Sequence, residues 1–420
     1  MNEKPRVVSP NREQLLLAPV DLERLIPDEH PARGVWALVE RLDLSAFYDE
    51  IEARGSDPGR PATDPKVLLA LWVYANAEGV GSARLLERLC ERDAPYRWIC
   101  GGVPVNHHTL SDFRVEHGKK LNGLLTPTLA ALMKQGVVTL RRVAQDGLKV
   151  RASAGAASFR RRQSLDRCLE EAKEQVRKLK REVEDDGSAS SRREKGARER
   201  AAAERQAAIE AALAELAEVE RKREERANQA KGEARVSTTD PACRVMKMAD
   251  GGFRPAYNVQ LATDVESGCI VGVGVTNHGT DQPNLVPMLD DIQQRTGKTP
   301  DNYLVDGGFV SRENIEVLTE RGAVAFAPVS EPRNQKVDRY TPKKDDSPAM
   351  AAWRVRMGTE QAKRIYVQRG ATAERTNADL RAHRGLDRLN VRGLAKVKSV
   401  VLLAALTFNA LRMIAGGILT

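Results

Sequence analysis

Apolar residues recur at spacings of three and four along the first third of the chain, which predicts helices from about residue 31 to residue 135. One such apolar stripe consists of Val35, Leu38, Val39 and Leu42. Thr63 or Asp64 followed by Pro65 is a typical helix start, and it predicts a helix over residues 66–77. We therefore expect an all-α N-terminal domain over residues 21–137, preceded by an extended, flexible arm of residues 1–20.

A helix predicted over residues 109–117 presents polar side chains, and it follows a turn rich in glycine. The side chains that could reach a DNA groove from this region are His107, His108, Ser111, Arg114 and His117. The same pattern fits the polar outer face of a small helical domain, so both interpretations remain open. A metal role for the two adjacent histidines is disfavoured, because neighbouring residues on a helix point apart.

The first strand pattern covers residues 141–150, RRVAQDGLKV, and it carries one acid, Asp146, at its centre. Residues 160–232 then interrupt the sheet pattern and are rich in Arg, Glu, Ala and Lys. A heptad seam is predicted within them, formed by Leu165, Leu169, Ala172, Val176, Leu179 and Val183, and resumed by Ile209, Ala212, Leu216 and Val219. We expect an antiparallel helical hairpin that is either simply a solvated insertion or an arm for DNA contact or dimerisation.

Strand patterns return at residues 255–263 and 269–275, with a hairpin turn between them. Helix and strand patterns then alternate over residues 283–294, 303–306, 311–320 and 323–327, and helical patterns follow at 350–366, 372–381 and 394–414. A meander of three strands followed by alternating helix and strand is the order of a ribonuclease-H-like α/β fold, in which the first and fourth strands are neighbours. We expect this fold, as a catalytic domain, over residues 138–420.

Charge and cysteine content narrow the class of protein. The formal net charge of +9 favours a polyanionic partner without requiring one. The five cysteines include no CxxC pair, so neither a zinc ribbon nor a disulfide framework is indicated, and a reducing, cytoplasmic location fits.

The N-terminus has no apolar signal-peptide core. Polar residues interrupt the apolar stretch 400–418, which therefore predicts a buried helix and no membrane span.

Three acids stand out by their order along the chain: Asp146 on the first strand, Asp306 at the end of the fourth, and Glu374 on a helix. Each alone is compatible with a turn or an exposed helix surface, and Glu360 competes with Glu374. Together they predict a site for Mg²⁺ or Mn²⁺, with two ions about 3.5–4 Å apart. One ion would activate a water or a 3′-hydroxyl, and the other would stabilise the leaving oxygen.

Five ordered blocks, spread over most of the chain, resemble a DDE transposase of a bacterial insertion sequence. The blocks are GRPATDPKVLLALWVYANAEG with NHHTLSDFRVEHG, VAQDGLKVRASAG, TDPACRVMKMADGG through HGTDQPNLVPML, YLVDGGFVSREN, and AERTNADLRAHRGLDRLNVRGLAKVKS. The last block resembles that of the clade with a Tyr-Arg-Glu-Lys signature. The resemblance implies that Asp146, Asp306 and Glu374 are the catalytic, metal-binding triad.

The same resemblance assigns Tyr366, Arg369 and Arg381 to the rest of the signature, and it implies that Tyr366 and Arg369 contact phosphates near the cleaved end. Arg369 lies five residues before Glu374, where the signature has four. Arg381 stands where lysine is usual, and arginine can bind a phosphate in a bidentate way.

Further basic residues are expected to bind backbone phosphate, which gives salt-dependent affinity with little sequence information. These residues are Lys149, Arg151, Arg384, Arg388, Arg392, Lys396 and Lys398. His278 and Asp281 follow the third strand and could approach the site, at best in a supporting position, although the pattern does not favour this role.

These features predict a metal-dependent transposase that binds terminal inverted repeats of double-stranded DNA, cleaves the element ends and joins them to a target. Handling two ends together implies a homodimer in the complex with DNA. Two alternatives remain at this stage: a nuclease of the same fold that does not join strands, and a catalytically inactive DNA-binding relic.

Overall fold

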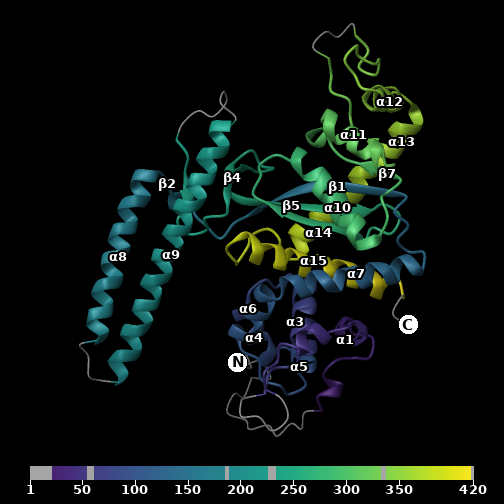
Figure 1. The fold of residues 1–420 in the computed structure, drawn as a ribbon. Coiled ribbons are helices and arrows are strands. Elements are labelled where there is room, and N and C mark those ends of the chain that lie inside the picture. The colour runs from purple at the N-terminus through teal and green to yellow at the C-terminus, as the bar shows by residue number, and fades with distance from the viewer. Residues whose placement is uncertain (1–20, 54–60, 185–188, 226–232, 333–336, 418–420) are drawn as a thin grey trace, which may run out of the picture.

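The computed structural model of the 420-residue chain describes residues 21–53, 61–184, 189–225, 233–332 and 337–417. The arm expected over residues 1–20 lies outside these ranges. Figure 1 shows three parts: a helical N-terminal region, a sheet flanked by helices, and a long helical hairpin that stands away from both.

The N-terminal region is helical throughout its described length, as predicted. It comprises a short 3-10 turn, η1 (Glu23–Leu25), and the helices α1 (Pro31–Arg41), α2 (Ser45–Tyr48), α3 (Pro65–Ala77), α4 (Ala83–Arg92), α5 (Ala94–Cys100), α6 (His107–Glu116) and α7 (Gly118–Lys134). The predicted stripe on α1 is confirmed, since Val35, Leu38 and Val39 are buried. Asp64 caps α3 by accepting a hydrogen bond of 2.8 Å from the amide of Lys66, and Pro65 occupies the first turn.

A mixed sheet forms the centre of the second part. Its strands are β1 (Arg142–Arg151), β4 (Arg244–Lys247), β5 (Phe253–Asp264), β6 (Ile270–Thr276), β7 (Asn302–Leu304) and β8 (Val324–Phe326). The main path runs β6–β5–β1–β7–β8, antiparallel as far as β1 and parallel beyond it. The short β4, which the sequence pattern did not predict, pairs with the first residues of β5.

The predicted pairing of the first and fourth strands is confirmed, because β1 and β7 are parallel neighbours with Ala144 opposite Leu304. The fourth strand is shorter than predicted and ends at Leu304. Asp306 therefore lies just beyond the strand, where it caps the 3-10 turn η4 (Gly307–Phe309). This edge of the sheet places Asp306 close to the centre of β1.

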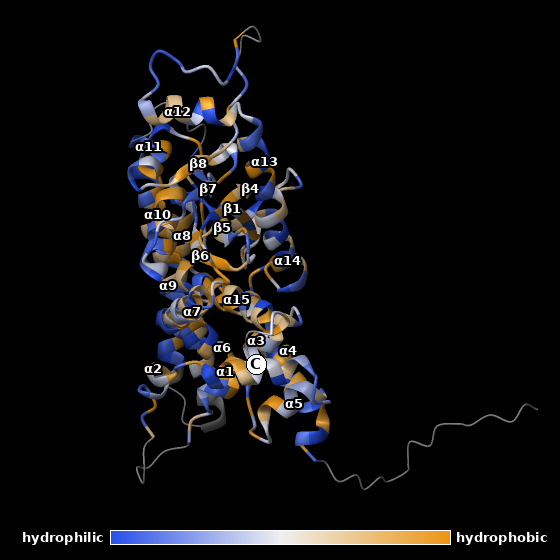
Figure 2. Ribbon diagram, turned by 90° about the vertical axis from the view of Figure 1, so that its right-hand side faces the viewer, coloured by the Kyte–Doolittle hydropathy of each residue, from blue (hydrophilic) through white to orange (hydrophobic). Residues whose placement is uncertain are grey.

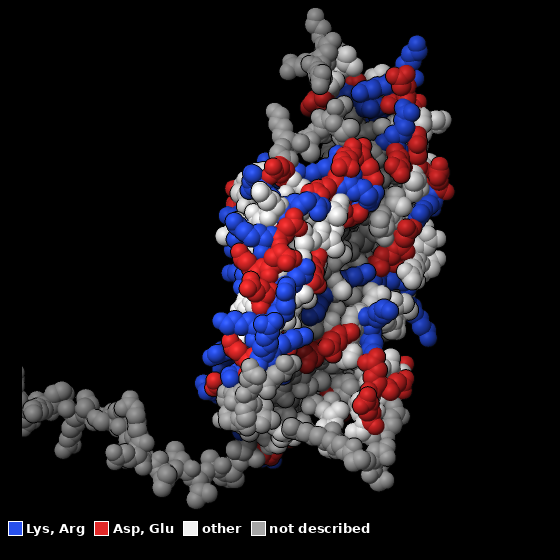
Figure 3. Space-filling view, turned by 60° about the vertical axis from the view of Figure 1, so that its left-hand side comes forward, with Lys and Arg blue, Asp and Glu red and all other residues white. Residues whose placement is uncertain are grey.

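The predicted helical hairpin is present as α8 (Arg162–Glu184) and α9 (Ala189–Glu225). Its seam is an apolar cluster separate from the main core, and its buried members include Leu165, Ala172, Ile209, Ala212 and Leu216. The side chain of Val183 and residues 185–188 and 226–232 lie outside the described part. On the face from which the hairpin projects, Lys and Arg are intermingled with Asp and Glu (Figure 3). This mixture suits a solvated hairpin.

A small two-stranded sheet closes the base of the hairpin. The strands β2 (Phe159–Arg160) and β3 (Val236–Ser237) pair there, just after the 3-10 turn η2 (Ala156–Ser158). The hydroxyls of Ser158 and Ser237 also hydrogen-bond at 2.7 Å. The insertion therefore leaves and rejoins the sheet domain at one place, and the register between β1 and β5 is undisturbed.

Helices cover both faces of the sheet. They are α10 (Leu285–Thr296, after the 3-10 turn η3, Gln282–Asn284), α11 (Arg312–Glu320), α12 (Pro348–Met357), α13 (Glu360–Arg369), α14 (Arg375–His383) and α15 (Leu394–Ala415). The prediction of one helix over residues 350–366 is wrong, because α12 ends before Gly358 and Thr359 caps a separate helix, α13. Between α13 and α14 the helix continues through a π turn, η5 (Gly370–Glu374).

The last helix, α15, joins the two main parts. It packs against α3, α6 and α7 on one side and against β6 on the other. Figure 2 shows this apolar helix between the sheet and the N-terminal helices. By length and composition α15 could span a membrane, but 72% of its most apolar window is buried inside the protein. The prediction of a buried core helix is therefore confirmed.

Candidate active site

The three predicted acids converge on one arginine. Asp146, at the centre of β1, accepts a hydrogen bond of 3.0 Å from Nη2 of Arg369 through its Oδ1. The same Nη2 lies 3.7 Å from Oδ2 of Asp306, and Nη1 lies 3.3 Å from Oε1 of Glu374. Each acid comes from a different element, so the fold brings together residues that are far apart in the sequence.

Asp146 is the most enclosed of the three acids, with its side chain 16% exposed against 37% for Asp306 and 66% for Glu374. Its Oδ2 accepts a second hydrogen bond of 3.0 Å from Nδ2 of Asn377 on α14. Burial raises the pKa of Asp146; the charge of Arg369 and the amide of Gly147 oppose this, and the charge of Asp306 adds to it. A buried carboxylate whose charge is incompletely balanced favours an added cation.

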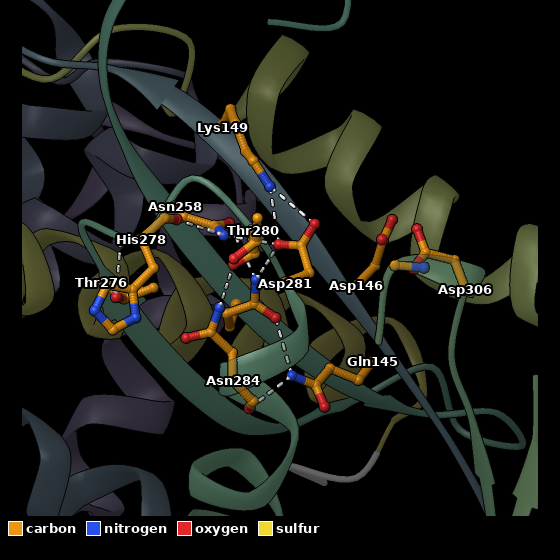
Figure 4. A network of polar contacts seen from close by, with 12 residues as sticks. Gln145, Asp146, Lys149, Asn258, Thr276, His278, Thr280, Asp281, Asn284 and Asp306 are labelled. Atoms are coloured by element: carbon orange, nitrogen blue, oxygen red, sulfur yellow. Dashed lines mark hydrogen bonds and ion pairs between the residues drawn. The ribbon is translucent and has the colours of Figure 1, made fainter. Parts of the chain in front are cut away.

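Asp306 is held in place by the turn that follows β7. Its Oδ1 accepts a hydrogen bond of 2.8 Å from the amide of Gly308, and this leaves Oδ2 directed toward Arg369. Figure 4 shows the carboxyl groups of Asp146 and Asp306 side by side. The position of Asp306 thus follows from the parallel pairing of β1 with β7 and from the cap of the next turn.

The π turn explains how Arg369 and Glu374 meet although five residues separate them. On a regular α-helix, residues five apart differ by about 140° around the axis, so their side chains diverge. A π turn accommodates one extra residue within a helix. Residues 370–374 form such a turn, and Arg369 and Glu374 regain the relation of residues four apart. The backbone of this turn therefore accommodates the spacing of five residues between Arg369 and Glu374.

The donor set suits a hard divalent cation, which prefers oxygen ligands. Beside the three carboxylates lies the buried Oδ1 of Asn377, which has no hydrogen-bond partner within the described part of the chain. Among the described residues, no group of three or more His, Cys, Asp or Glu side chains forms a preassembled metal cluster. The carboxylates instead surround the guanidinium of Arg369, a cation that this chain supplies itself.

A second polar network occupies the opposite face of β1 (Figure 4). Asp281 pairs with Lys149 at 2.8 Å and also accepts hydrogen bonds of 2.7 Å from Asn258 and 2.8 Å from Gln260. A Cβ atom on Gly147 would lie only 2.3 Å from Oδ1 of Asp281. A Cβ atom at this position would force Asp281 and Gln260 to move, so the present packing of this network depends on a glycine at position 147.

The network continues to Gln145 on the same face of β1. Gln145 donates hydrogen bonds of 2.9 Å to Gln260 and 3.1 Å to the carbonyl of Asn284, and it accepts one of 2.8 Å from the hydroxyl of Tyr303. The predicted supporting position of Asp281 corresponds to this place directly behind the Asp146 strand. His278 is exposed, and its carbonyl accepts a hydrogen bond from Asn258.

Several residues predicted to bind phosphate are engaged inside the protein. Arg114 is 5% exposed, donates 2.7 Å to the carbonyl of Gly81 and stacks over the ring of Trp72 at 4.2 Å. The buried face of α6 carries this side chain into the core, which disfavours the DNA contact predicted for Arg114. Lys149 pairs with Asp281, and Arg384 contacts Asp379 and the carbonyl of Ala77.

Other predicted positions are better placed for a ligand. Arg388 is exposed, Arg381 and Tyr366 are half-buried, and burial raises the pKa of Tyr366. A run of exposed cations follows the site, formed by Arg375, Arg388, Arg392, Lys396 and Lys398. Glu360 lies at the far end of α13 and pairs with Lys363 at 2.8 Å. The structure thus favours Glu374 over Glu360 as the partner of Asp146 and Asp306.

The polar helix α6 shows why its sequence allowed two interpretations. The ring of His107 contacts Glu87 at 2.8 Å, and His117 packs edge-on against Phe47 and Phe113. These two histidines serve the internal structure of the helical region. His108 is exposed and stacks on His107.

Sequence reasoning missed Asn377, which is 8% exposed and donates to Asp146. The signal was present, because Asn377 lies three residues after Glu374 and shares its helix face. It also missed that the role of Gly147 is set by the Asp281 carboxylate, which no local pattern could reveal.

Comparison with known families gives two matches. Residues 20–116 match a family described as Transposase domain (DUF772), and residues 237–410 match the Transposase DDE domain. The second family implies a ribonuclease-H-like fold, and domains of its kind generally use divalent metal ions. Comparisons with curated proteins and with solved structures gave no match.

Proposed function

Since its two matched domains support a DDE transposase of an insertion sequence, we propose that this chain cleaves DNA at the ends of its element and joins those ends to a target. The observation that carries the proposal is the meeting of Asp146, Asp306 and Glu374 around one guanidinium. Three carboxylates from separate elements around one cationic position make the arrangement that metal-dependent phosphodiester chemistry needs.

In this proposal Asp146, Asp306 and Glu374 would hold Mg²⁺ or Mn²⁺, which would supply activation of an oxygen nucleophile and stabilisation of the leaving 3′-oxygen. Asn377 fixes the rotamer of Asp146 through its 3.0 Å hydrogen bond. The amide of Gly308 orients Asp306 in the same way. These contacts determine where the carboxylate oxygens lie, and geometric precision of this kind decides the rate of phosphoryl transfer.

The DNA backbone would lie along the exposed cations that follow the site. They are Arg375, Arg388, Arg392, Lys396 and Lys398, which belong to α14, α15 and the segment between them, and the half-buried Arg381 is also on α14. Tyr366 and Arg369 are the residues closest to the acids that could contact the phosphate at the cleaved end. The terminal inverted repeats would be bound by the N-terminal helical domain, residues 21–137, and two chains would hold the two ends as a homodimer.

The first test is cleavage of labelled DNA carrying the element's own ends, with Mg²⁺, Mn²⁺ or EDTA. Wild type should nick the ends only with metal, and Asp146→Asn and Glu374→Gln should lower the rate at least about a thousandfold while binding the ends normally. Glu360→Gln is the matched control and should cleave like wild type. Cleavage that survives Glu374→Gln would refute the assignment of this acid, and strand-transfer product separates a transposase from a nuclease that only cuts.

For the helical hairpin we propose a role in assembling two chains on DNA, because it is rooted in the sheet domain yet has its own core. Replacing residues 161–235 with a short Gly/Ser linker between β2 and β3 should leave the monomer folded and weaken formation of the paired-end complex. Light scattering and gel shifts measure this. An unchanged paired-end complex would identify the hairpin as a dispensable, solvated insertion.

A further inference from the structure

We propose that Arg369 is an internal substitute for the metal: it holds the three acids together in the metal-free enzyme and must release them when metal binds. This inference rests on the proposed function, since it assigns Asp146, Asp306 and Glu374 to metal binding. It adds that the site contains its own competing cation, so that metal affinity is set partly by an arginine of this chain.

Arg369 lies among the three acids and contacts each of them. Its side chain is 11% exposed, and its two terminal nitrogens reach Asp146, Asp306 and Glu374 at 3.0, 3.7 and 3.3 Å. Three carboxylates this close repel one another unless a cation lies between them. One guanidinium offsets only part of their charge, so the site remains attractive to a further cation.

Two of the three contacts of Arg369 are long. Charge-assisted hydrogen bonds between nitrogen and carboxylate oxygen are usually about 2.7–2.9 Å long. The contact with Asp146 is close to this range, whereas those with Glu374 and Asp306 are longer, and the buried Nε has no hydrogen-bond partner among the described residues. The guanidinium is therefore shared among three acceptors and bound closely by only one of them. Such an arrangement keeps the acids together and still allows the arginine to leave.

A divalent ion held by these acids would compete with Arg369 through its charge. The carboxylates that would hold the ion are the ones that now accept N–H groups of Arg369, at Oδ1 of Asp146 and Oε1 of Glu374. A divalent ion and a guanidinium at the same carboxylates repel each other. Arg369 must therefore turn away when metal binds, and its planar guanidinium is then free for the phosphate that its sequence position predicts.

The π turn supplies the geometry for this exchange. Arg369 is the last residue of α13, directly before the turn, so its backbone lies where the helix changes hydrogen-bonding pattern. Because Glu374 closes the same turn, the two side chains meet across it. The π turn thus determines the positions of both Arg369 and Glu374.

The test is Mn²⁺ binding to the full-length chain without DNA, measured by titration calorimetry and by the signal of free Mn²⁺ in electron paramagnetic resonance. Arg369→Gln should bind Mn²⁺ about tenfold more tightly than wild type, which corresponds to about 1.4 kcal/mol. It should also unfold at a lower temperature than wild type in EDTA and gain more from added Mn²⁺. Arg375→Gln, which removes an exposed positive charge next to Glu374, should change Mn²⁺ affinity less than threefold.

The outcomes separate the two proposals. Equal Mn²⁺ affinity for wild type, Arg369→Gln and Arg375→Gln, abolished by Asp306→Asn, would overturn the role of Arg369 and leave the metal site standing. No Mn²⁺ binding to any of these proteins would overturn the metal site itself. Equal tightening by both arginine variants would show that only general charge matters, and it would also overturn the proposal. If Arg369→Gln does not fold, Arg369→Lys takes its place, because a compact ammonium cannot bridge three carboxylates and should still tighten binding measurably.

Discussion

The acidic side chains on the two faces of β1 differ in how closely they are paired with cations and hydrogen-bond donors. On one face, Asp281 is enclosed by Lys149, Asn258 and Gln260 at 2.7–2.9 Å. On the other face, Asp146, Asp306 and Glu374 share a single arginine at 3.0–3.7 Å. The strand that separates them is the same, so the difference lies entirely in how each side chain is partnered.

This difference distinguishes groups that hold the structure from groups that are available for chemistry. A half-buried carboxylate with short contacts to a cation and two amides is a fixed part of the structure, and removing it leaves these partners without their acceptor. A cluster of acids with long, shared contacts retains attraction for an external cation. Substitutions on the first face should therefore affect stability, and substitutions on the second should affect activity.

The largest effect on stability is expected for Asp281→Ala. It leaves the ammonium of Lys149 and two amide groups without their acceptor, and the cost should be about 3 kcal/mol in the free energy of unfolding. Chemical denaturation monitored by circular dichroism measures it. Asp290→Ala on α10 is the matched control, since that carboxylate is 57% exposed and pairs with Arg321 at the surface. A cost below about 1 kcal/mol for Asp281→Ala would contradict the structural role of this face.

A smaller loss of about 1–3 kcal/mol is expected for Gly147→Ala, because the new methyl group would meet Oδ1 of Asp281 at 2.3 Å and Nε2 of Gln260 at 2.7 Å. The matched control is Gly274→Ala on β6, whose Cβ would have no neighbour nearer than 3.4 Å. Thermal unfolding of both variants compares them directly. Equal stability of the two would show that Asp281 can move away from β1 without cost.

The smallest effect concerns the catalytic face and tests the π turn. Deleting the exposed Ala371 should convert the turn into regular α-helix with Arg369 and Glu374 still facing each other, so stability should change by less than about 1 kcal/mol and cleavage should persist. Deleting Ala378 from the regular helix α14 is the control, and it should rotate the following residues by about 100° and reduce both properties. Loss of cleavage in the Ala371 deletion alone would show that the extra residue is itself required.

The order of β1, β5, β6, β7 and β8 was predictable from the sequence, and so was the position of Asp146 and Asp306 along the chain, whereas β4 was not predicted. The period-two patterns around Asp146 and over residues 255–275 are local signals, and the β1–β7 pairing follows from chain topology. Glu374 needed the family resemblance, because an exposed helical glutamate has no pattern of its own. Its proximity to Asp146 depends on the π turn. The spacing of five residues between Arg369 and Glu374 is a sign of an irregular helix, but it does not predict a π turn.

The partners of charged side chains were beyond sequence analysis. Lys149 and Arg114 are basic residues in a basic chain, and the sequence alone gave no reason to separate them from exposed phosphate-binding residues. The structure separates them, because Lys149 meets Asp281, which is 132 residues away, and Arg114 meets the carbonyl of Gly81. Such contacts are set by tertiary packing, and neither periodicity nor charge content reports them.

The placement of α15 has a consequence for how the protein is made. The helix that completes the core around α3, α6 and α7 comes about 260 residues after α7 in the sequence. A nascent polypeptide therefore carries its N-terminal helices with an uncovered apolar surface until residues 394–415 leave the ribosome. Premature termination before residue 394 removes this helix and leaves both parts incomplete, so neither part reaches its final packing before α15 is synthesised.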